Sequence, residues 1–174
     1  MDTDRALMEG VTNGDEAAFT EVVHRYGGRL LAVAGRLLGS RADAEDATQR
    51  ALLQCFSEAR SYQPQWAVST WLYRILTNIC VDELRRRSAR TAHAVATSRT
   101  DGAPAEAGRY MDLHRALERV PREARVLLAL RYVDGLSYGE LARIRGISVN
   151  TVKSQLARGK ALLRSQLGAT GGRR

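Results

Sequence analysis

The sequence has few of the residues that catalytic and metal-binding sites need. It contains 2 Cys and 3 His in 174 residues, and Cys55 and Cys80 have no metal-ligand spacing with each other or with the histidines. There is no carboxylate pair, nucleophile–base arrangement or phosphate-binding loop, so the sequence predicts neither an enzyme nor a cofactor nor a small-molecule substrate. Both cysteines fall in apolar helical patterns, and we expect buried thiols in a reducing cytoplasm.

Long apolar runs, prolines and aromatic residues are also scarce. No stretch approaches the roughly 18 apolar residues of a membrane span, and the acidic N-terminus does not resemble a signal peptide. The 3 Pro and the aromatic content of 6% suit an all-α protein. We therefore predict an all-α fold with two small helical domains joined by a flexible linker, in a cytoplasmic protein.

The positive charge is concentrated in the C-terminal part of the chain. The net charge is +8, but residues 109–174 hold 14 Lys and Arg against 5 Asp and Glu, whereas residues 1–108 hold 13 against 14. A basic module beside a near-neutral one suggests a polyanion as the partner of the first and a protein as the partner of the second.

The segment LSYGELARIRGISVNTVKSQLARGKALLR (136–164) has the pattern of a helix-turn-helix. Ser137 and Glu140 form an S-x-x-E capping box at the start of a short helix, and Gly146 is placed to end that helix. Ser148 can then cap a second helix through Thr151 or its neighbours. The order of capping box, small residue, glycine and cationic helix favours a DNA-binding motif over an ordinary amphipathic hairpin.

The second helix of this motif has two distinct faces at about 100° per residue. The residues predicted to pack inward are Val149, Val152, Leu156, Gly159 and Leu163. The opposite face and its cationic flank supply the predicted residues for duplex DNA: Asn150, Thr151, Lys153, Ser154, Arg158 and Lys160. Small side chains between donors and cations let a helix approach the major groove, while the cations meet phosphates.

Three helical patterns precede this module. The first covers 13–38, with Asn13 or Asp15 as its cap and a possible interruption at Gly27-Gly28. The second runs from Ser40 to about Arg60. Its predicted inward residues are Leu52, Cys55 and Phe56, and its predicted docking residues on another face are Asp46, Gln49 and Leu53. On the residue pattern alone, a solvated face accounts for this second set more simply.

The third pattern follows the loop YQPQWAVS (62–69) and runs from about Thr70 to Arg87. The residues predicted to contact unpaired DNA are Trp66, Trp71, Arg74, Asn78, Asp82, Arg85 and Arg86. An aromatic residue beside Arg and Asn suits unstacked bases and a strand held by cations. The alternative is that both tryptophans anchor the core while the arginines favour the helix C-terminus.

Composition divides the chain into a domain at 10–88, a linker at 89–108 and a domain at 109–166. Residues 88–108 are mostly Ala, Thr, Ser and Gly, and cannot bury enough surface to fold alone. A helix is expected near 109–120, and Pro121 can begin the next one at its first turn. The last residues, GATGGRR (168–174), are expected to be disordered.

Three segments in this order resemble an extracytoplasmic-function (ECF) sigma factor: DAEDATQRALLQCF (43–56), STWLYRILTNICVDELRRR (69–87) and 117–164. The resemblance implies a promoter-specificity subunit of RNA polymerase. It implies that 10–88 binds the polymerase β′ clamp through the helix carrying Asp46 and Gln49, and opens the −10 element. It implies that loop 62–69 captures a flipped base, and that 109–166 reads the −35 element.

The resemblance also implies partners: core RNA polymerase, contacted at the β′ clamp and the β flap, promoter DNA, and an anti-sigma factor, often a membrane-anchored one. The competing hypothesis is a dimeric helix-turn-helix regulator that binds operators unaided, with the N-terminal half as a regulatory domain. Three residues depart from the family pattern. Arg50 occupies an often acidic position, Arg145 occupies a commonly aliphatic one, and Gly159 lies within the recognition helix.

Overall fold

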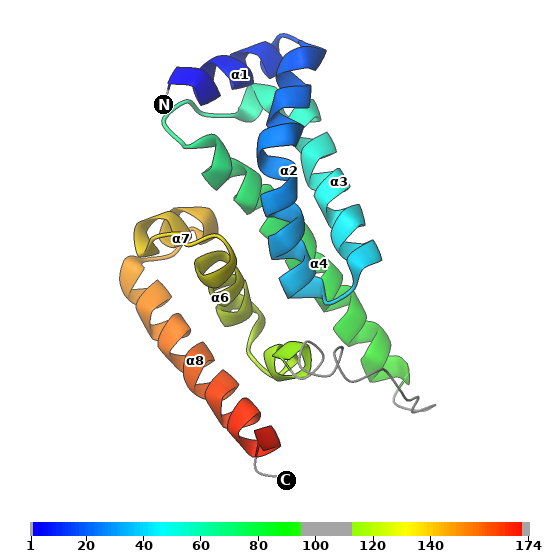
Figure 1. Ribbon diagram of the computed structural model, residues 1–174, viewed down its shortest axis with the longest axis vertical. Coiled ribbons are helices and arrows are strands. Elements are labelled where there is room, and N and C mark those ends of the chain that lie inside the picture. The colour runs from blue at the N-terminus through cyan, green and yellow to red at the C-terminus, as the bar shows by residue number, and fades with distance from the viewer. Residues whose placement is uncertain (1, 95–112, 172–174) are drawn as a thin grey trace.

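The computed structural model describes residues 2–94 and 113–171, and these form helices without a β-strand (Figure 1). The N-terminal module contains α1 (Asp2–Thr12), α2 (Glu16–Leu38), α3 (Arg41–Ser57), the short 3-10 helix η1 (Ala59–Ser61) and α4 (Val68–Ala94). The C-terminal module contains the helical residues 113–118, α6 (Arg122–Val133), α7 (Tyr138–Arg145) and α8 (Val149–Gly171). The all-α, two-module prediction is confirmed.

Local capping signals define most of the N-terminal helix boundaries. The Asp15 carboxylate accepts hydrogen bonds from the backbone N–H groups of Ala17 and Ala18, at 2.9 and 3.3 Å. Ser40 Oγ accepts from the Asp43 N–H at 3.3 Å, and Gly39 ends α2 at φ 66°. Helix α2 continues through Gly27-Gly28 without interruption, because its buried apolar residues on both sides pack against one core.

Several predicted boundaries are wrong. Helix α1 was not predicted, yet its Met8 and Val11 are buried against the module. Helix α4 extends past Arg87 and projects beyond α2 and α3 (Figure 1), so residues 89–94, assigned to the linker, are helical. The rest of the predicted linker lies outside the described residues. The predicted disorder of the tail is wrong for residues 168–171, which continue α8, and residues 172–174 are not described.

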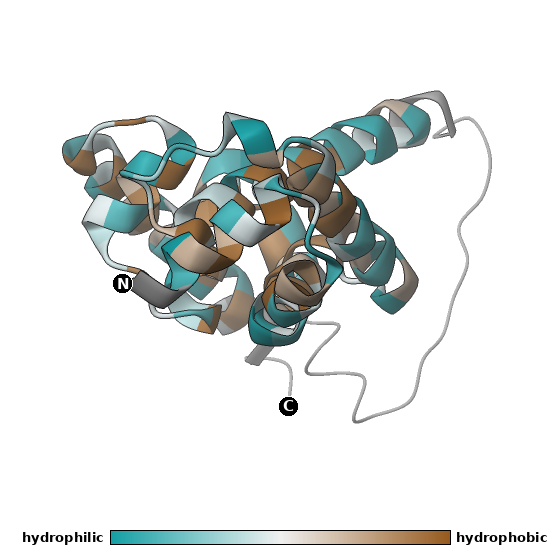
Figure 2. Cartoon of the chain, turned by 90° about the horizontal axis from the view of Figure 1, so that it is seen from above, coloured by the Kyte–Doolittle hydropathy of each residue, from teal (hydrophilic) through white to brown (hydrophobic). Residues whose placement is uncertain are grey.

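Two side chains predicted to face inward lie on the surface. Phe56 is 40% exposed and Val149 is also 40% exposed, whereas Leu52, Cys55, Val152 and Leu156 are buried as expected. Figure 2 shows that hydrophobic residues gather where the helices face one another and that the outer faces are largely hydrophilic. The buried residues of the two modules form one continuous hydrophobic cluster, which includes Leu72 of α4 and Leu141 of α7.

Candidate nucleic-acid and polymerase interfaces

The predicted helix-turn-helix is formed by α7, a turn at Gly146, and α8. The Glu140 carboxylate accepts from the Ser137 N–H at 2.7 Å, and Ser137 Oγ accepts from the Glu140 N–H at 3.3 Å, which completes the capping box. The Ser137 hydroxyl also donates to the Glu140 carboxylate, at 2.6 Å, and this bond together with the one from the Ser137 N–H lowers the pKa of Glu140. Gly146 adopts φ 64°, the left-handed conformation that glycine tolerates without a Cβ clash. Ser148 Oγ caps α8 by accepting from the Thr151 N–H at 3.0 Å.

Helix α8 presents most of its predicted DNA-contacting residues to solvent. Asn150, Lys153, Ser154 and Arg158 are exposed, while Val152 and Leu156 on the opposite side are buried. Thr151 is half-buried, and both its hydroxyl and its backbone N–H hydrogen-bond to Ser148 Oγ. Between Asn150 and Arg158 the exposed positions of α8 carry only polar, cationic or small side chains, so this part of the helix can approach a DNA groove closely.

Lys160 lies apart from this set. Its Nζ is 5.4 Å from the centroid of the Tyr132 ring, at the edge of a different surface. Gly159 is buried against α6, since a Cβ built there would lie 3.1 Å from Leu128 Cδ1 and 3.2 Å from Ala124 Cβ. The glycine therefore permits the close crossing of α8 and α6.

Trp66, Trp71 and Arg74 meet at a cavity of about 250 Å³ between the 62–69 loop and α4. Both tryptophans are half-buried, and neither belongs to the fully buried core. The Trp71 ring is 5.4 Å from the Tyr62 ring, and the Arg74 guanidinium is 5.7 Å from the Trp66 ring. Tyr62 Oη donates to the Trp66 carbonyl at 2.6 Å, which fixes the loop. The cavity thus has aromatic walls and a cation at its edge.

The remaining predicted residues on α4 are exposed but engaged in local contacts. Arg85 Nη1 is 3.2 Å from Asp82 Oδ1, and Arg86 Nη1 is 3.5 Å from Glu83 Oε2. The Arg85–Asp82 pair is exposed on both sides and contributes little to stability, so Arg85 can be redirected to a phosphate. Asn78 is exposed, and its Oδ1 accepts a hydrogen bond from Arg145 of the other module at 3.2 Å.

Asp46, Gln49 and Leu53 all lie exposed on α3, and Leu53 is 64% exposed. Phe56 continues the same spacing by three residues and places its ring 5.0 Å from the Phe19 ring of α2. The structure therefore adds Phe56, which was predicted to face inward, to the predicted docking residues Asp46, Gln49 and Leu53. The signal was present, because 46, 49, 53 and 56 share one face at helical spacing.

Comparison with known protein families gives one match in each module. Residues 22–90 match the family Sigma-70 region 2, and residues 110–163 match Sigma-70, region 4. The chain is 30% identical to the ECF RNA polymerase sigma factor SigW of Bacillus subtilis (strain 168) over 92% of this chain and 94% of SigW. The chain belongs to the ECF sigma factors. It is an alternative sigma factor, which directs RNA polymerase to specific promoters.

Two solved sigma factor structures support the family assignment at the level of the fold. The structure of CnrH in complex with the cytosolic domain of CnrY is matched with a TM-score of 0.75 at 27% identity, over 95% of this sigma factor and 97% of CnrH. The sigma factor RpoE in complex with the anti-sigma factor NepR, from Bartonella quintana, is matched with a TM-score of 0.70 at 25% identity. That second match covers 86% of this chain and 96% of RpoE.

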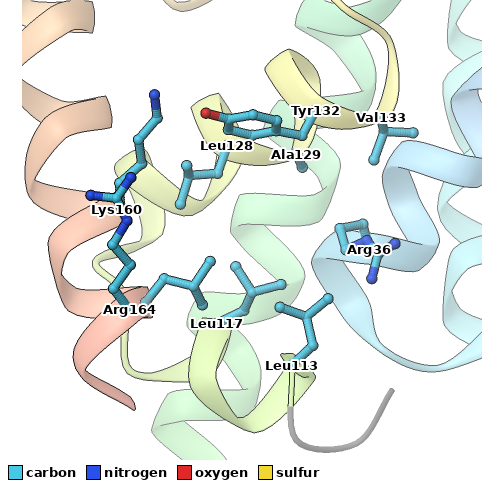
Figure 3. Close-up of a pocket in the computed structure, with 10 residues that line it drawn as sticks. Arg36, Leu113, Leu117, Leu128, Ala129, Tyr132, Val133, Lys160 and Arg164 are labelled. Atoms are coloured by element: carbon cyan, nitrogen blue, oxygen red, sulfur yellow. The ribbon is translucent and has the colours of Figure 1, made fainter. Parts of the chain in front are cut away.

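This sigma factor also has an apolar groove that sequence reasoning did not identify (Figure 3). The groove has a volume of about 360 Å³, and Leu113, Leu117 and Leu128 are among its lining residues. Lys160 and Arg164 of α8 stand at one side, and Arg36 of α2 stands at the other. An apolar floor between cations suits a protein segment with apolar and acidic side chains.

Membrane-spanning helices, metal-ligand groups and the two cysteines are further features on which the sequence makes a prediction. No helix within 2–94 or 113–171 has both the length and the apolar character needed to cross a membrane, and no group of metal-ligating side chains occurs there. Cys55 and Cys80 are buried free thiols, and burial raises the pKa of each to about 12. The expectation that both thiols are buried is therefore confirmed.

Proposed function

We propose that this sigma factor engages promoter DNA through two separate surfaces. The exposed face of α8 reads the −35 element as duplex through Asn150, Lys153, Ser154 and Arg158, with Thr151 and Lys160 at its margins. The cavity formed by Trp66, Trp71 and Arg74 holds a base extruded from the −10 element. The observation that carries this proposal is the aromatic cavity at the start of α4, since a flipped base needs both a stacking surface and room.

The rest of the α4 surface continues this site along the strand. Asn78, Asp82, Arg85 and Arg86 follow Arg74 towards the C-terminal end of the helix. The arginines supply charge for the phosphates, and the partner of Arg85, Asp82, is exposed and exchangeable. A single strand released by melting would therefore run from the cavity along α4.

We propose two polymerase contacts. Asp46, Gln49, Leu53 and Phe56 form the surface for the β′ clamp, where apolar side chains exposed beside polar ones favour a protein partner. The apolar groove between α6 and α8 receives the β flap. An anti-sigma factor that covered either surface would block assembly with the polymerase.

The same proposal places the protein in the cytoplasm, beside the polymerase, and gives it no catalytic role of its own. Two weak DNA contacts held by one polymerase gain from their high effective concentration, so each module alone should bind promoters poorly.

Run-off transcription tests this function. Core RNA polymerase is incubated with a pool of genomic promoters, with and without this protein, and the new transcript ends are mapped. Discrete start sites that share −35 and −10 elements are expected. Duplex binding by the protein alone, without any transcription, would favour an operator-binding regulator instead.

Matched variants connect the transcripts to the two surfaces. Lys153→Ala and Arg158→Ala should weaken transcription from these promoters, whereas Arg115→Ala, an exposed arginine of the same module outside α8, should not. Equal losses in all three variants would point to general charge and would contradict the assigned −35 surface.

A further inference from the structure

The two modules are joined by polar contacts far apart in the sequence. Arg29 of α2 donates two hydrogen bonds to the Asp134 carboxylate at the end of α6, at 2.7 and 2.6 Å. The Asp134 side chain is only 9% exposed, so a carboxylate of the C-terminal module is neutralised by an arginine of the N-terminal one. The pairing with Arg29 offsets the cost of burying the Asp134 carboxylate between the modules. Without Arg29, the buried charge would destabilise the closed arrangement.

Arg145 forms the second contact, at the end of α7. Its side chain is 11% exposed and donates to Glu123 Oε2 in its own module at 2.7 Å. It also donates to Thr77 Oγ1 at 3.1 Å and to Asn78 Oδ1 at 3.2 Å, both on α4. The planar guanidinium is suited to this bridge because it can bind a carboxylate and two side-chain oxygens at once.

A steric contact closes the other end of the interface. The His114 ring lies over Gly39, where a Cβ would come within 2.1 Å of ring atoms. Burial lowers the pKa of His114, in keeping with a neutral ring packed against the α2 cap. The contacts of Arg29, Arg145 and His114 together hold the modules in one closed arrangement.

The Arg145 contact lies on the surface that the proposed function assigns to −10 DNA. Asn78 is four residues beyond Arg74 and seven beyond Trp71, so the three share one side of α4. In the closed arrangement the aromatic cavity remains open, but Arg145 contacts α4 at Asn78, where the proposed DNA strand would continue beyond the cavity. A base could therefore enter the cavity, but α7 would block the rest of the strand from α4.

We propose that Arg145 is an intramolecular latch that competes with promoter DNA for α4. With the Arg29–Asp134 pair, it holds the free chain closed, and the −10 strand binds fully only when the helix-turn-helix module moves away. This inference rests on the proposed DNA surface of α4, but closure itself does not depend on it.

The test measures closure and DNA binding on the full-length free protein. Small-angle X-ray scattering gives the radius of gyration of the wild type, of Arg145→Ala, of Arg29→Ala and of the double variant. Fluorescence anisotropy measures the binding of a labelled random-sequence single-stranded 20-mer to the same proteins. Arg143→Ala is the matched control, because Arg143 is an exposed arginine on α7 two residues from the latch.

We expect a compact wild type, a larger radius of gyration in the double variant, and intermediate values in the single ones. We expect the double variant to bind the oligonucleotide about threefold to tenfold more tightly, as a shift from a closed to an open population requires. Removing cations normally weakens DNA binding, so a gain in affinity cannot arise from the lost charge. The Arg143→Ala variant should show unchanged or slightly weaker binding.

Three results would overturn the latch: an extended wild type, a double variant as compact as the wild type, or weaker oligonucleotide binding in a folded double variant. Far-UV circular dichroism checks folding, and Asp134→Asn replaces Arg29→Ala if that variant unfolds. Run-off transcription with the wild type separates the two proposals. If the free chain is extended in scattering but still directs transcription, the latch is wrong and the promoter function stands. If the free chain is compact and the double variant binds the oligonucleotide more tightly, but no transcript forms, the promoter function is wrong and the latch stands.

Discussion

The two proposed DNA surfaces of this sigma factor are built differently. On α8, exposed polar and cationic side chains stand on a helix whose other face is buried against α6. On α4, half-buried aromatic rings surround a cavity, and the exposed arginines beyond it are paired with carboxylates. The first is a convex surface that fits a duplex groove, and the second is a concave one that fits a single base. The difference supports the proposal that α8 recognises duplex DNA and that α4 captures a single strand.

The largest effect is expected from the cavity. Trp66→Ala removes one of its walls and should reduce transcription about tenfold to a hundredfold, because stacking of a base on an aromatic residue is worth about 1–3 kcal/mol. Run-off assays and permanganate reactivity of −10 thymines measure the loss. A template premelted at the −10 element should restore part of the activity, and Trp66→Phe should retain more than Trp66→Ala. Permanganate reactivity equal to that of the wild type would contradict a role in strand capture.

Arg158→Ala should have an effect of about tenfold on promoter binding by the assembled polymerase, as expected for a contact with a base edge. Premelting should not rescue this variant, since the duplex −35 element is unaffected by it. Lys153→Ala should act more weakly and reduce the salt dependence of binding. If premelting rescued Arg158→Ala and Trp66→Ala equally, the division of labour between α8 and α4 would be wrong.

Gly159→Val should destabilise the packing of α8 against α6 without changing the exposed residues proposed to contact DNA. The added side chain must displace Leu128 or Ala124, which lie against the glycine, so the free energy of unfolding should fall by about 1 kcal/mol or more. Urea unfolding measures the change. Gly168→Val is the control on the same helix, because no atom lies within 4 Å of a Cβ there. Equal stability of the two variants would contradict the close crossing of α8 and α6.

The smallest effect is expected from His114. Its lowered pKa means that the unfolded chain binds more protons than the folded one between the folded pKa and about 6.5. The stability contribution is therefore present above pH 6.5 and is lost as the pH falls through this window. Urea unfolding from pH 7.5 to pH 5.5 should show a smaller pH dependence in His114→Gln than in the wild type. A pH dependence in His114→Gln equal to that of the wild type would contradict this contribution.

The sequence by itself determined the helix-turn-helix. Ser137, Glu140, Gly146 and Ser148 act on backbone groups within four residues of themselves, so their pattern is readable without knowledge of the fold. The same holds for the Asp15 and Ser40 caps and for the grouping of Trp66, Trp71 and Arg74, which a loop and one helix turn bring together. Local chemistry of this kind predicted most helices and the chemical character of both DNA surfaces.

Only the tertiary structure decided which apolar residues would remain exposed and which polar ones would be covered. Phe56 lies outside because Phe19 of α2 meets its ring at the surface, and the groove exists because 113–118, α6 and α8 converge. Arg145, which reads as a departure from a family pattern, bridges the two modules through oxygens 22, 67 and 68 residues away in the sequence. Such contacts depend on how the helices pack against one another. Neither helical periodicity nor a capping residue shows which side chain of a distant helix will lie against a given residue.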